Sequence, residues 1–191
     1  MRADAARNRD RVLEAAELVL TRDGLDAPMR AIARQAGVGV GTIYRQYRTK
    51  EALYQAIMAD RMERLVTRAS SLAAGTDAGA AFFAFFDSIV TDATTKKIFA
   101  DALAPVVQEL AGLDAKAASG EAAGHDVLTA IEALLVRAQR AGAVRKDVGM
   151  PEVLGLLSGA CLAAKQQRWD AKRRGSNLCS AFVLRCIMRR A

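Results

Sequence analysis

The residues best suited to recognition chemistry lie close together in the stretch 29–50, which reads MRAIARQAGVGVGTIYRQYRTK. In the run 41–47, Ile43 and Tyr47 are four residues apart, so they share one face if the run is helical. The opposite face then carries hydrogen-bonding side chains, which are Thr42, Tyr44, Arg45 and Gln46. A short helix that buries a narrow stripe and presents polar groups is suited to reading base edges in the DNA major groove. A plain corner between two core helices would give the same pattern, so both interpretations stay open here.

A second short helix is expected directly before this run. Ile32, Ala33 and Ala36 share one face at helical spacing. Gly37 is placed to end the helix, because glycine enters a left-handed cap without steric penalty. Val38 can then fill the corner. Two helices joined by a glycine turn form a helix-turn-helix unit.

Positive charge is concentrated at the start of the chain. The 191 residues contain 28 Lys and Arg against 21 Asp and Glu, a net charge of +7. Residues 1–50 hold ten basic and six acidic residues and carry +4, while the longer remainder carries +3. This distribution is typical of a nucleic-acid-binding head on a less charged body, although many basic proteins bind no nucleic acid.

The composition favours helices. Hydrophobic residues make up 52% of the chain but aromatic residues only 5%, so the apolar volume comes from Ala, Leu and Val. No apolar run approaches the roughly eighteen residues of a membrane span, and the charged N-terminus lacks the apolar core of a secretory signal. We therefore expect an all-α protein in the cytoplasm, without membrane contact.

Residues that could perform catalysis or bind metals are sparse. His125 is the single histidine, and a capping or surface role suits its place at a helix start. Asp87 and Asp92 are five residues apart and do not share a helix face. The cysteines lack CxxC spacing and are expected to be free buried thiols; they are Cys161, Cys179 and Cys186. The GVGVG run follows no strand, so it is not a dinucleotide-binding fingerprint. We expect no enzymatic activity, cofactor or metal.

A first helix is expected over residues 5–22, with Gly24 as its C-terminal cap. Its expected inward face consists of Val12, Leu13, Ala16, Val19 and Leu20. Arg7, Arg9 and Arg11 lie near its start, where cations oppose the helix dipole. These arginines either lie near DNA phosphates or form a solvated face, and the sequence does not separate the two.

Thr49 is expected to cap a long helix that runs to about residue 72. A mobile connection is expected over residues 112–124, which are rich in Ala and Gly. The further expected helices are 78–93, 95–104, 125–141, 151–169 and 178–189. Asp77 is expected to cap the helix 78–93, and Glu132, Arg137 and Arg140 of the helix 125–141 are expected to face solvent. The prediction is thus about nine helices and no strands.

Four phenylalanines lie within residues 82–86, on the expected helix 78–93. Phe82, Phe86 and Ile89 share one face, and Phe83 and Phe85 cover the flanking faces. The rings either form a plain core or line an apolar cavity. In the second case the candidate ligand-binding residues are Phe82, Phe86, Phe99 and Trp169.

The order of these features resembles the TetR family of bacterial transcriptional regulators. The resemblance covers roughly residues 8–58 and rests on a fixed order of motifs. These are Gly24, Ile32-Ala33, Ala36-Gly37-Val38, Gly41-Thr42-Ile43-Tyr44, Tyr47, Lys50 and Ala52-Leu53. It favours DNA binding over the plain helical corner.

The resemblance implies an all-helical homodimer. Residues 1–50 would form the helix-turn-helix DNA-binding domain, and residues 51–191 the ligand-binding and dimerisation domain. The last two helices would pair across the dimer through about 151–190. A stripe of mostly small residues suits that seam, namely Gly155, Ser158, Gly159 and Leu162.

The resemblance also implies roles for residues of the head. Arg30 and Thr42 match positions that contact bases or phosphates. Tyr44 and Lys50 match the phosphate-binding tyrosine and lysine. The variable recognition positions are Val40, Gly41, Arg45 and Gln46.

The head departs from the family pattern in two places. Gly39-Val40 stands where a polar pair is common, and Arg48 stands where Pro or Lys is common. Because Val40 cannot hydrogen-bond, base reading is expected to fall chiefly on Arg30, Arg45 and Gln46.

The expected function is a repressor that binds a palindromic operator and is released by a small, mainly apolar ligand. Two alternatives stay open, which are a DNA-binding regulator without a small-molecule effector and an enzyme on a helical scaffold. A closed apolar cavity bordered by Phe82, Phe86, Phe99 and Trp169 would favour the repressor with a ligand, whereas a solid core would favour the regulator without an effector.

Overall fold

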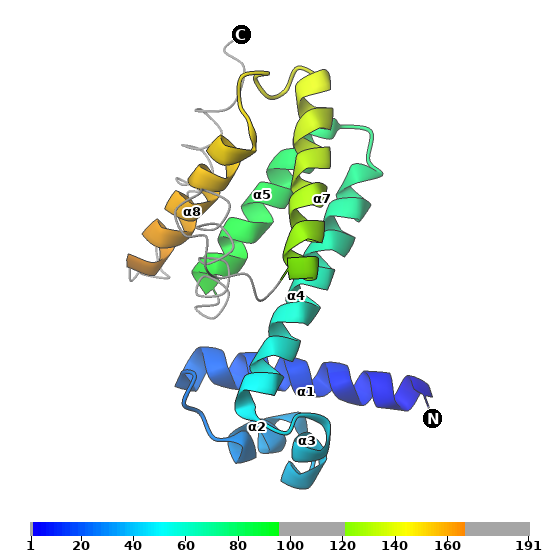
Figure 1. The fold of residues 1–191 in the computed structure, drawn as a ribbon, viewed down its shortest axis with the longest axis vertical. Helices are drawn as coiled ribbons and strands as arrows, with labels where there is room; N and C mark the ends of the chain where they lie inside the picture. Colours follow the sequence, from blue (N-terminus) through cyan, green and yellow to red (C-terminus); the bar gives the residue numbers. More distant parts are fainter. Residues whose placement is uncertain (1, 96–120, 167–191) are drawn as a thin grey trace. The chain divides into compact units, whose positions relative to one another are not determined.

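The computed structural model describes residues 2–95 and 121–166, and every regular element in these ranges is a helix (Figure 1). This confirms the predicted all-α fold. The expected helices 95–104 and 178–189 lie outside the described residues, apart from Thr95. The chain divides into two compact units, Met1–Arg61 and Met62–Ala191. The predicted functional division between residues 50 and 51 stays a prediction.

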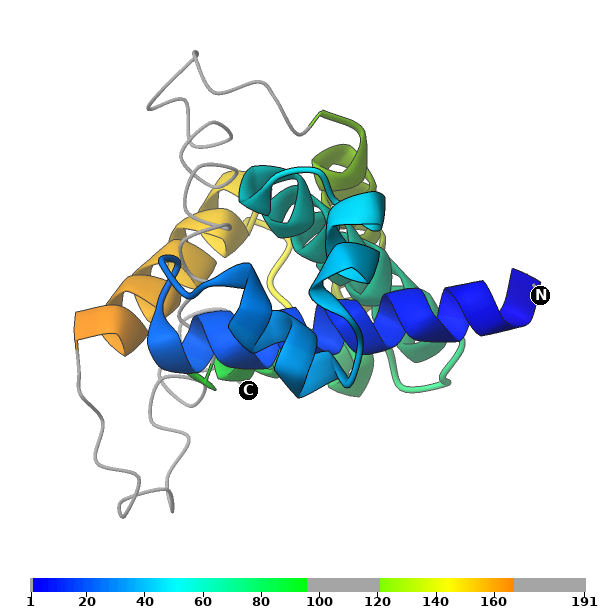
Figure 2. The ribbon, with the colours of Figure 1, turned by 90° about the horizontal axis from the view of Figure 1, so that it is seen from below.

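The first unit contains α1 (Arg2–Asp23), α2 (Met29–Ala36), α3 (Val40–Gln46) and the first half of α4 (Lys50–Ala73). Helix α2 packs against α1 (Figure 2). The inward face predicted for α1 is confirmed, and its buried members are Val12, Leu13, Ala16, Val19 and Leu20. Gly24 ends α1 with a φ of 85°, as expected for a left-handed cap.

A buried ion pair joins α1 to α4 within this unit. Arg61 Nη2 donates to Glu17 Oε1 at 2.6 Å, and the two side chains are only 6% and 14% exposed. Charges removed from water in this way are stable only when they are paired and hydrogen-bonded. The pair therefore fixes α4 against α1.

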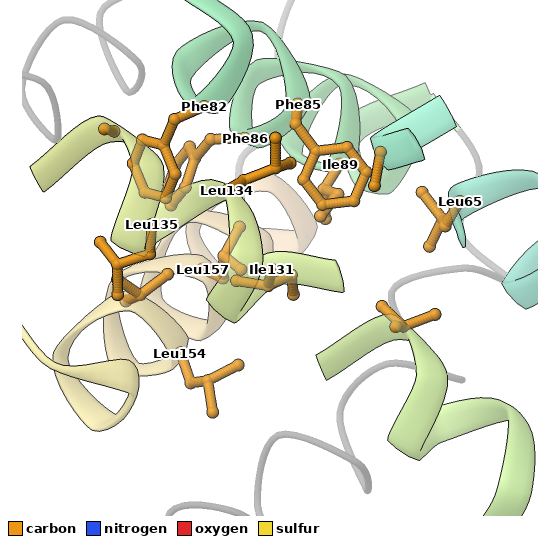
Figure 3. Packing of buried hydrophobic residues seen from close by; sticks show 14 of the residues in the cluster. Leu65, Phe82, Phe85, Phe86, Ile89, Ile131, Leu134, Leu135, Leu154 and Leu157 are labelled. Carbon is orange, nitrogen blue, oxygen red and sulfur yellow. The ribbon is translucent and has the colours of Figure 1, made fainter. Parts of the chain in front are cut away.

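The second unit contains the second half of α4, then α5 (Ala78–Thr95), α7 (Glu121–Arg140) and α8 (Met150–Gln166). Helix α5 packs against both α7 and α8 (Figure 1). Asp77 Oδ1 accepts a 2.8 Å bond from the Ala80 amide and caps α5, as predicted. The apolar side chains of these helices form one core cluster (Figure 3). No helix within the described ranges is long and apolar enough to cross a membrane.

Two expectations about α7 were wrong. The helix begins at Glu121, so residues 121–124 of the expected connection are helical. Glu121 and the alanines after it favour helix, and Gly124 is tolerated within the first turns. Arg137, expected to face solvent, is half-buried, and it donates to the carbonyls of Ala73 and, at 2.9 Å, of Gly75. The last turn of α4 has no basic residue of its own, so Arg137 supplies a cation to its C-terminal carbonyls.

Candidate nucleic-acid interface

Helix α3 is held from its inner side. Ile43 is fully buried and Tyr47 is 7% exposed, which confirms the inward stripe expected at this spacing. The Thr42 amide bonds the Gly39 carbonyl at 2.9 Å, and the Tyr47 amide bonds the Ile43 carbonyl at 2.7 Å. Burial raises the pKa of the Tyr47 phenol, and the nearby cation of Arg9 opposes that shift. The helix is thus anchored by one thin apolar stripe.

The opposite side of α3 faces water. Val40 is 42% exposed and Tyr44 is 49% exposed, so an apolar and an aromatic side chain both face water on this side. Arg45 and Gln46 are exposed beside them, and Thr42 is half-buried. This face therefore offers a cation, an amide, a phenol and an apolar side chain from two turns of one helix.

Gly41 lies on the same outward face. A Cβ built at this position would meet no atom within 4 Å, and the backbone is not in the left-handed region. The fold therefore does not require glycine here. Glycine within a helix lowers stability by about 1 kcal/mol relative to alanine, so its presence calls for another reason.

The turn before α3 is closed by backbone bonds. Gly37 has a φ of 66°, its amide bonds the Arg34 carbonyl at 3.2 Å, and the Val38 amide bonds the Ala33 carbonyl at 3.0 Å. This is the Schellman arrangement, for which glycine is the favoured residue. Val38 is half-buried in the corner, as expected. The buried face of α2 contains Met29, Ile32, Ala33 and Ala36.

Two further predicted contact residues flank α3 in the chain. Arg30, in the first turn of α2, is exposed. Lys50, in the first turn of α4, is half-buried, and Thr49 caps that helix by accepting a 3.1 Å bond from the Ala52 amide. All eight predicted DNA-contacting residues thus lie on α2, α3 or the start of α4, and none is fully buried. Their contacts with DNA stay predictions.

The bond that Arg11 makes in the first unit was not predicted from the sequence. Arg11 Nη2 donates to the Ala36 carbonyl at 2.9 Å, which joins α1 to the last residue of α2. The two residues are 25 apart in the chain, and the surplus of nearby arginines gave no signal to distinguish Arg11.

Two of the four candidate ligand residues, Phe82 and Phe86, lie in the described part of the second unit. Phe82 and Phe86 are 2% and 4% exposed, and they pack with residues of α7 and α8 (Figure 3). Phe85, expected on a flanking face, is buried as deeply as Phe82. Phe83 is half-buried, and its ring meets the ring of Phe82 edge to face with 5.4 Å between the ring centroids. Phe99 and Trp169 lie outside the described residues.

Part of the surface of α8 carries only small side chains and is not covered by other residues of the described chain. Gly155 and Gly159 are exposed, and a Cβ at either would meet no atom within 4 Å. Ser158 is half-buried beside them, and the side chain of Leu162 lies outside the described part of the chain.

Two family models match the chain. The model described as "Bacterial regulatory proteins, tetR family" matches residues 12–57, which include α2 and α3. The model described as "Transcriptional regulator SbtR-like, C-terminal domain" matches residues 77–179, more than half of the chain.

Two solved structures are similar over nearly their full length. A TetR transcription regulatory protein from Mycobacterium vanbaalenii is 40% identical, with a TM-score of 0.68 over 87% of this chain and 98% of that one. A TetR transcriptional regulator from Streptomyces coelicolor is 31% identical, with a TM-score of 0.72 over 96% of this chain and 99% of that one. The transcriptional regulator UidR of Escherichia coli is 36% identical over 69 residues, so the match spans about a third of either protein (36% and 35%).

Proposed function

The chain belongs to the TetR family of bacterial transcriptional regulators, and from this premise we propose that it is a cytoplasmic repressor. It binds a palindromic operator as a homodimer and is released by a small, mainly apolar ligand. The observation that carries the proposal is the outward face of α3, where a phenol, a cation and an amide are exposed on a helix whose inner side is anchored by Ile43 and Tyr47. Such a helix fits the major groove.

Base reading is assigned to the exposed polar side chains of the head. Arg45 and Arg30 suit guanine, because a guanidinium can donate two bonds to O6 and N7. Gln46 suits adenine, and Val40 suits a thymine methyl group. Tyr44 and Lys50 hold backbone phosphates, with Thr42 at the groove edge, so they set the register of α3 without reading sequence.

Dimerisation is assigned to the segment of about 151–190. The open positions at Gly155 and Gly159 support this, because helices approach closely where side chains are absent. Two heads related by a two-fold axis then meet successive major grooves about 34–36 Å apart, which is why the operator is palindromic.

The ligand is assigned to the apolar interior of the second unit, around Phe82 and Phe86, with Phe99 and Trp169 as further candidates. It acts by binding better to the state of the dimer whose heads do not fit the operator, and its effect is limited to that difference in affinity. Helix α4 has residues in both units and is the element that carries the change.

One observation favours a second candidate, a regulator without a small-molecule effector. Phe82 and Phe86 are almost fully buried among α5, α7 and α8, as expected of a solid core. A thermal-shift screen of apolar and aromatic compounds separates the candidates. A compound that raises the melting temperature and releases DNA supports the repressor with a ligand, while a screen without such a compound supports the second candidate.

The proposed function is tested by enriching bound duplexes from a random DNA pool with the full chain. We expect two inverted half-sites whose centres are about one helical turn, or a multiple of it, apart. Affinity for the enriched duplex should fall steeply with salt, because each phosphate contact releases counterions. A pool without an enriched sequence, or an affinity that hardly changes with salt, would contradict the proposal.

A further inference from the structure

The peptide that leaves α2 sets the direction in which the chain enters α3. The last four carbonyls of a helix lack partners within it. In α2, the Ala33 and Arg34 carbonyls are bonded by the Val38 and Gly37 amides of the turn. The carbonyl of Ala36, the last helical residue, accepts its bond from outside the helix-turn-helix, from Arg11.

Arg11 lies on a part of α1 that is packed into the core of the first unit. It stands on α1 directly before Val12, which is fully buried in the core of the first unit. Its Nη2 lies 2.9 Å from the Ala36 oxygen and would lie 3.3 Å from a Cβ at Gly37, so the guanidinium covers the start of the turn. A cation at the C-terminal end of a helix is also favoured by the helix dipole.

We propose that Arg11 is a positioning residue that orients the recognition helix through the Ala36 carbonyl and does not itself contact DNA phosphate. The inference rests on the proposed function, since it assigns a role within the same DNA-binding head. The guanidinium that bonds the Ala36 carbonyl fixes the plane of the Ala36–Gly37 peptide relative to α1. The turn that follows then delivers Val40, Tyr44 and Arg45 in one fixed orientation.

The rival explanation is that Arg11 binds a phosphate, because its side chain is exposed at the protein surface. The two roles differ in their response to salt. A phosphate contact contributes about one unit to the slope of log affinity against log salt, and its loss lowers the slope by that amount. A positioning bond within the protein contributes affinity at every salt concentration and leaves the slope unchanged.

The test uses the full chain and a labelled duplex that carries the sequence enriched by the wild-type chain. Binding is measured by fluorescence anisotropy over a range of salt for wild type, Arg11→Gln and Arg11→Lys. Arg68→Gln is the matched control for the lost charge, because Arg68 is an exposed arginine of α4 in the second unit. Urea unfolding shows that each variant is folded under the binding conditions.

We expect Arg11→Gln to weaken binding about threefold to tenfold at every salt concentration, the effect of one hydrogen bond at an exposed site. Its slope should equal that of Arg68→Gln. Arg11→Lys should recover part of the affinity, because an ammonium can still donate to the Ala36 carbonyl.

Two results would overturn the inference. A slope lower by about one in Arg11→Gln than in Arg68→Gln would make Arg11 a phosphate contact. Unchanged affinity in the folded variant, with or without a lower stability, would leave Arg11 without a role in orienting α3. Failure of the wild-type chain to enrich any sequence would instead refute the proposed function, so the two failures are distinguishable.

Discussion

Substitution of Gly41 by alanine should move stability and DNA affinity in opposite directions. The added methyl group meets no protein atom within 4 Å and strains no backbone angle. Alanine is more favourable than glycine in a helix by up to about 1 kcal/mol, and less near a helix end. Because Gly41 is the second residue of α3, we expect the free energy of unfolding to rise by about 0.5 kcal/mol.

The same methyl group should weaken operator binding. We infer that DNA approaches the backbone of α3 closely at this open position, where an added carbon would overlap the DNA. Overpacking of a tight contact typically costs about 1–3 kcal/mol, which corresponds to roughly a fivefold to hundredfold loss of affinity.

The assay pairs urea unfolding with anisotropy titrations of the enriched duplex. Ser70→Ala is the control, because it also improves helix propensity at an exposed site but lies on α4 in the second unit. It should gain stability without a change in affinity. A Gly41→Ala protein that binds DNA as tightly as wild type would refute the close approach of DNA to α3.

Three further predictions concern the half-buried Arg137, the ion pair of Glu17 with Arg61, and the buried phenol of Tyr47. Arg137→Gln should lower the free energy of unfolding, measured by urea denaturation, by about 1–2 kcal/mol, because it weakens the bonds to the carbonyls at the end of α4. The control Arg140→Gln, on the exposed face of α7, should change that free energy by less than about 0.5 kcal/mol. In a double-mutant cycle, Glu17→Leu and Arg61→Leu should each lower the free energy of unfolding by about 2–4 kcal/mol. The double variant should lose clearly less than the sum of the two losses. Strict additivity would exclude coupling between the two charges. Burial raises the pKa of Tyr47 in the folded state above its ordinary value of 10.0, so the neutral phenol stabilises the fold below about pH 10 and this contribution is lost as pH rises further. The wild-type chain should therefore lose more stability than Tyr47→Phe between about pH 9 and 10.5. Equal losses of stability in the two proteins would contradict the raised pKa.

The helix boundaries were largely predictable because they depend on local chemistry. Gly24 and Gly37 end their helices in left-handed caps, and Thr49 and Asp77 begin theirs with side-chain caps. The start of α7 was not predicted, because a run of alanines and glycines gives no periodic apolar signal by which helix and connection differ.

Bonds between distant residues could not be read from the sequence. Arg11 and Ala36 are 25 residues apart, and Arg137 and Ala73 are 64 apart. Which of several arginines meets a helix end depends on tertiary packing, and periodicity carries no information on it. The deep burial of Phe85 has the same cause, since it depends on which helices surround α5.

The sequence predicted which side chains of the candidate interface are exposed and which are buried. The spacing of Ile43 and Tyr47 identified the inward face of α3, and the outward residues followed from helix geometry. Whether Val40, Arg45 and Gln46 read bases depends on the DNA, which no property of the free chain specifies. Their roles remain predictions.

We propose that two copies of α3 read two half-sites of a palindrome. The most direct test is the affinity of the full chain for the enriched duplex as the spacing between its half-sites is changed. Insertion of about half a helical turn, roughly five base pairs, turns one half-site to the opposite face of the DNA. We expect this insertion to reduce affinity to that of a duplex with a single half-site. Equal affinity for the original and the lengthened duplex would contradict it.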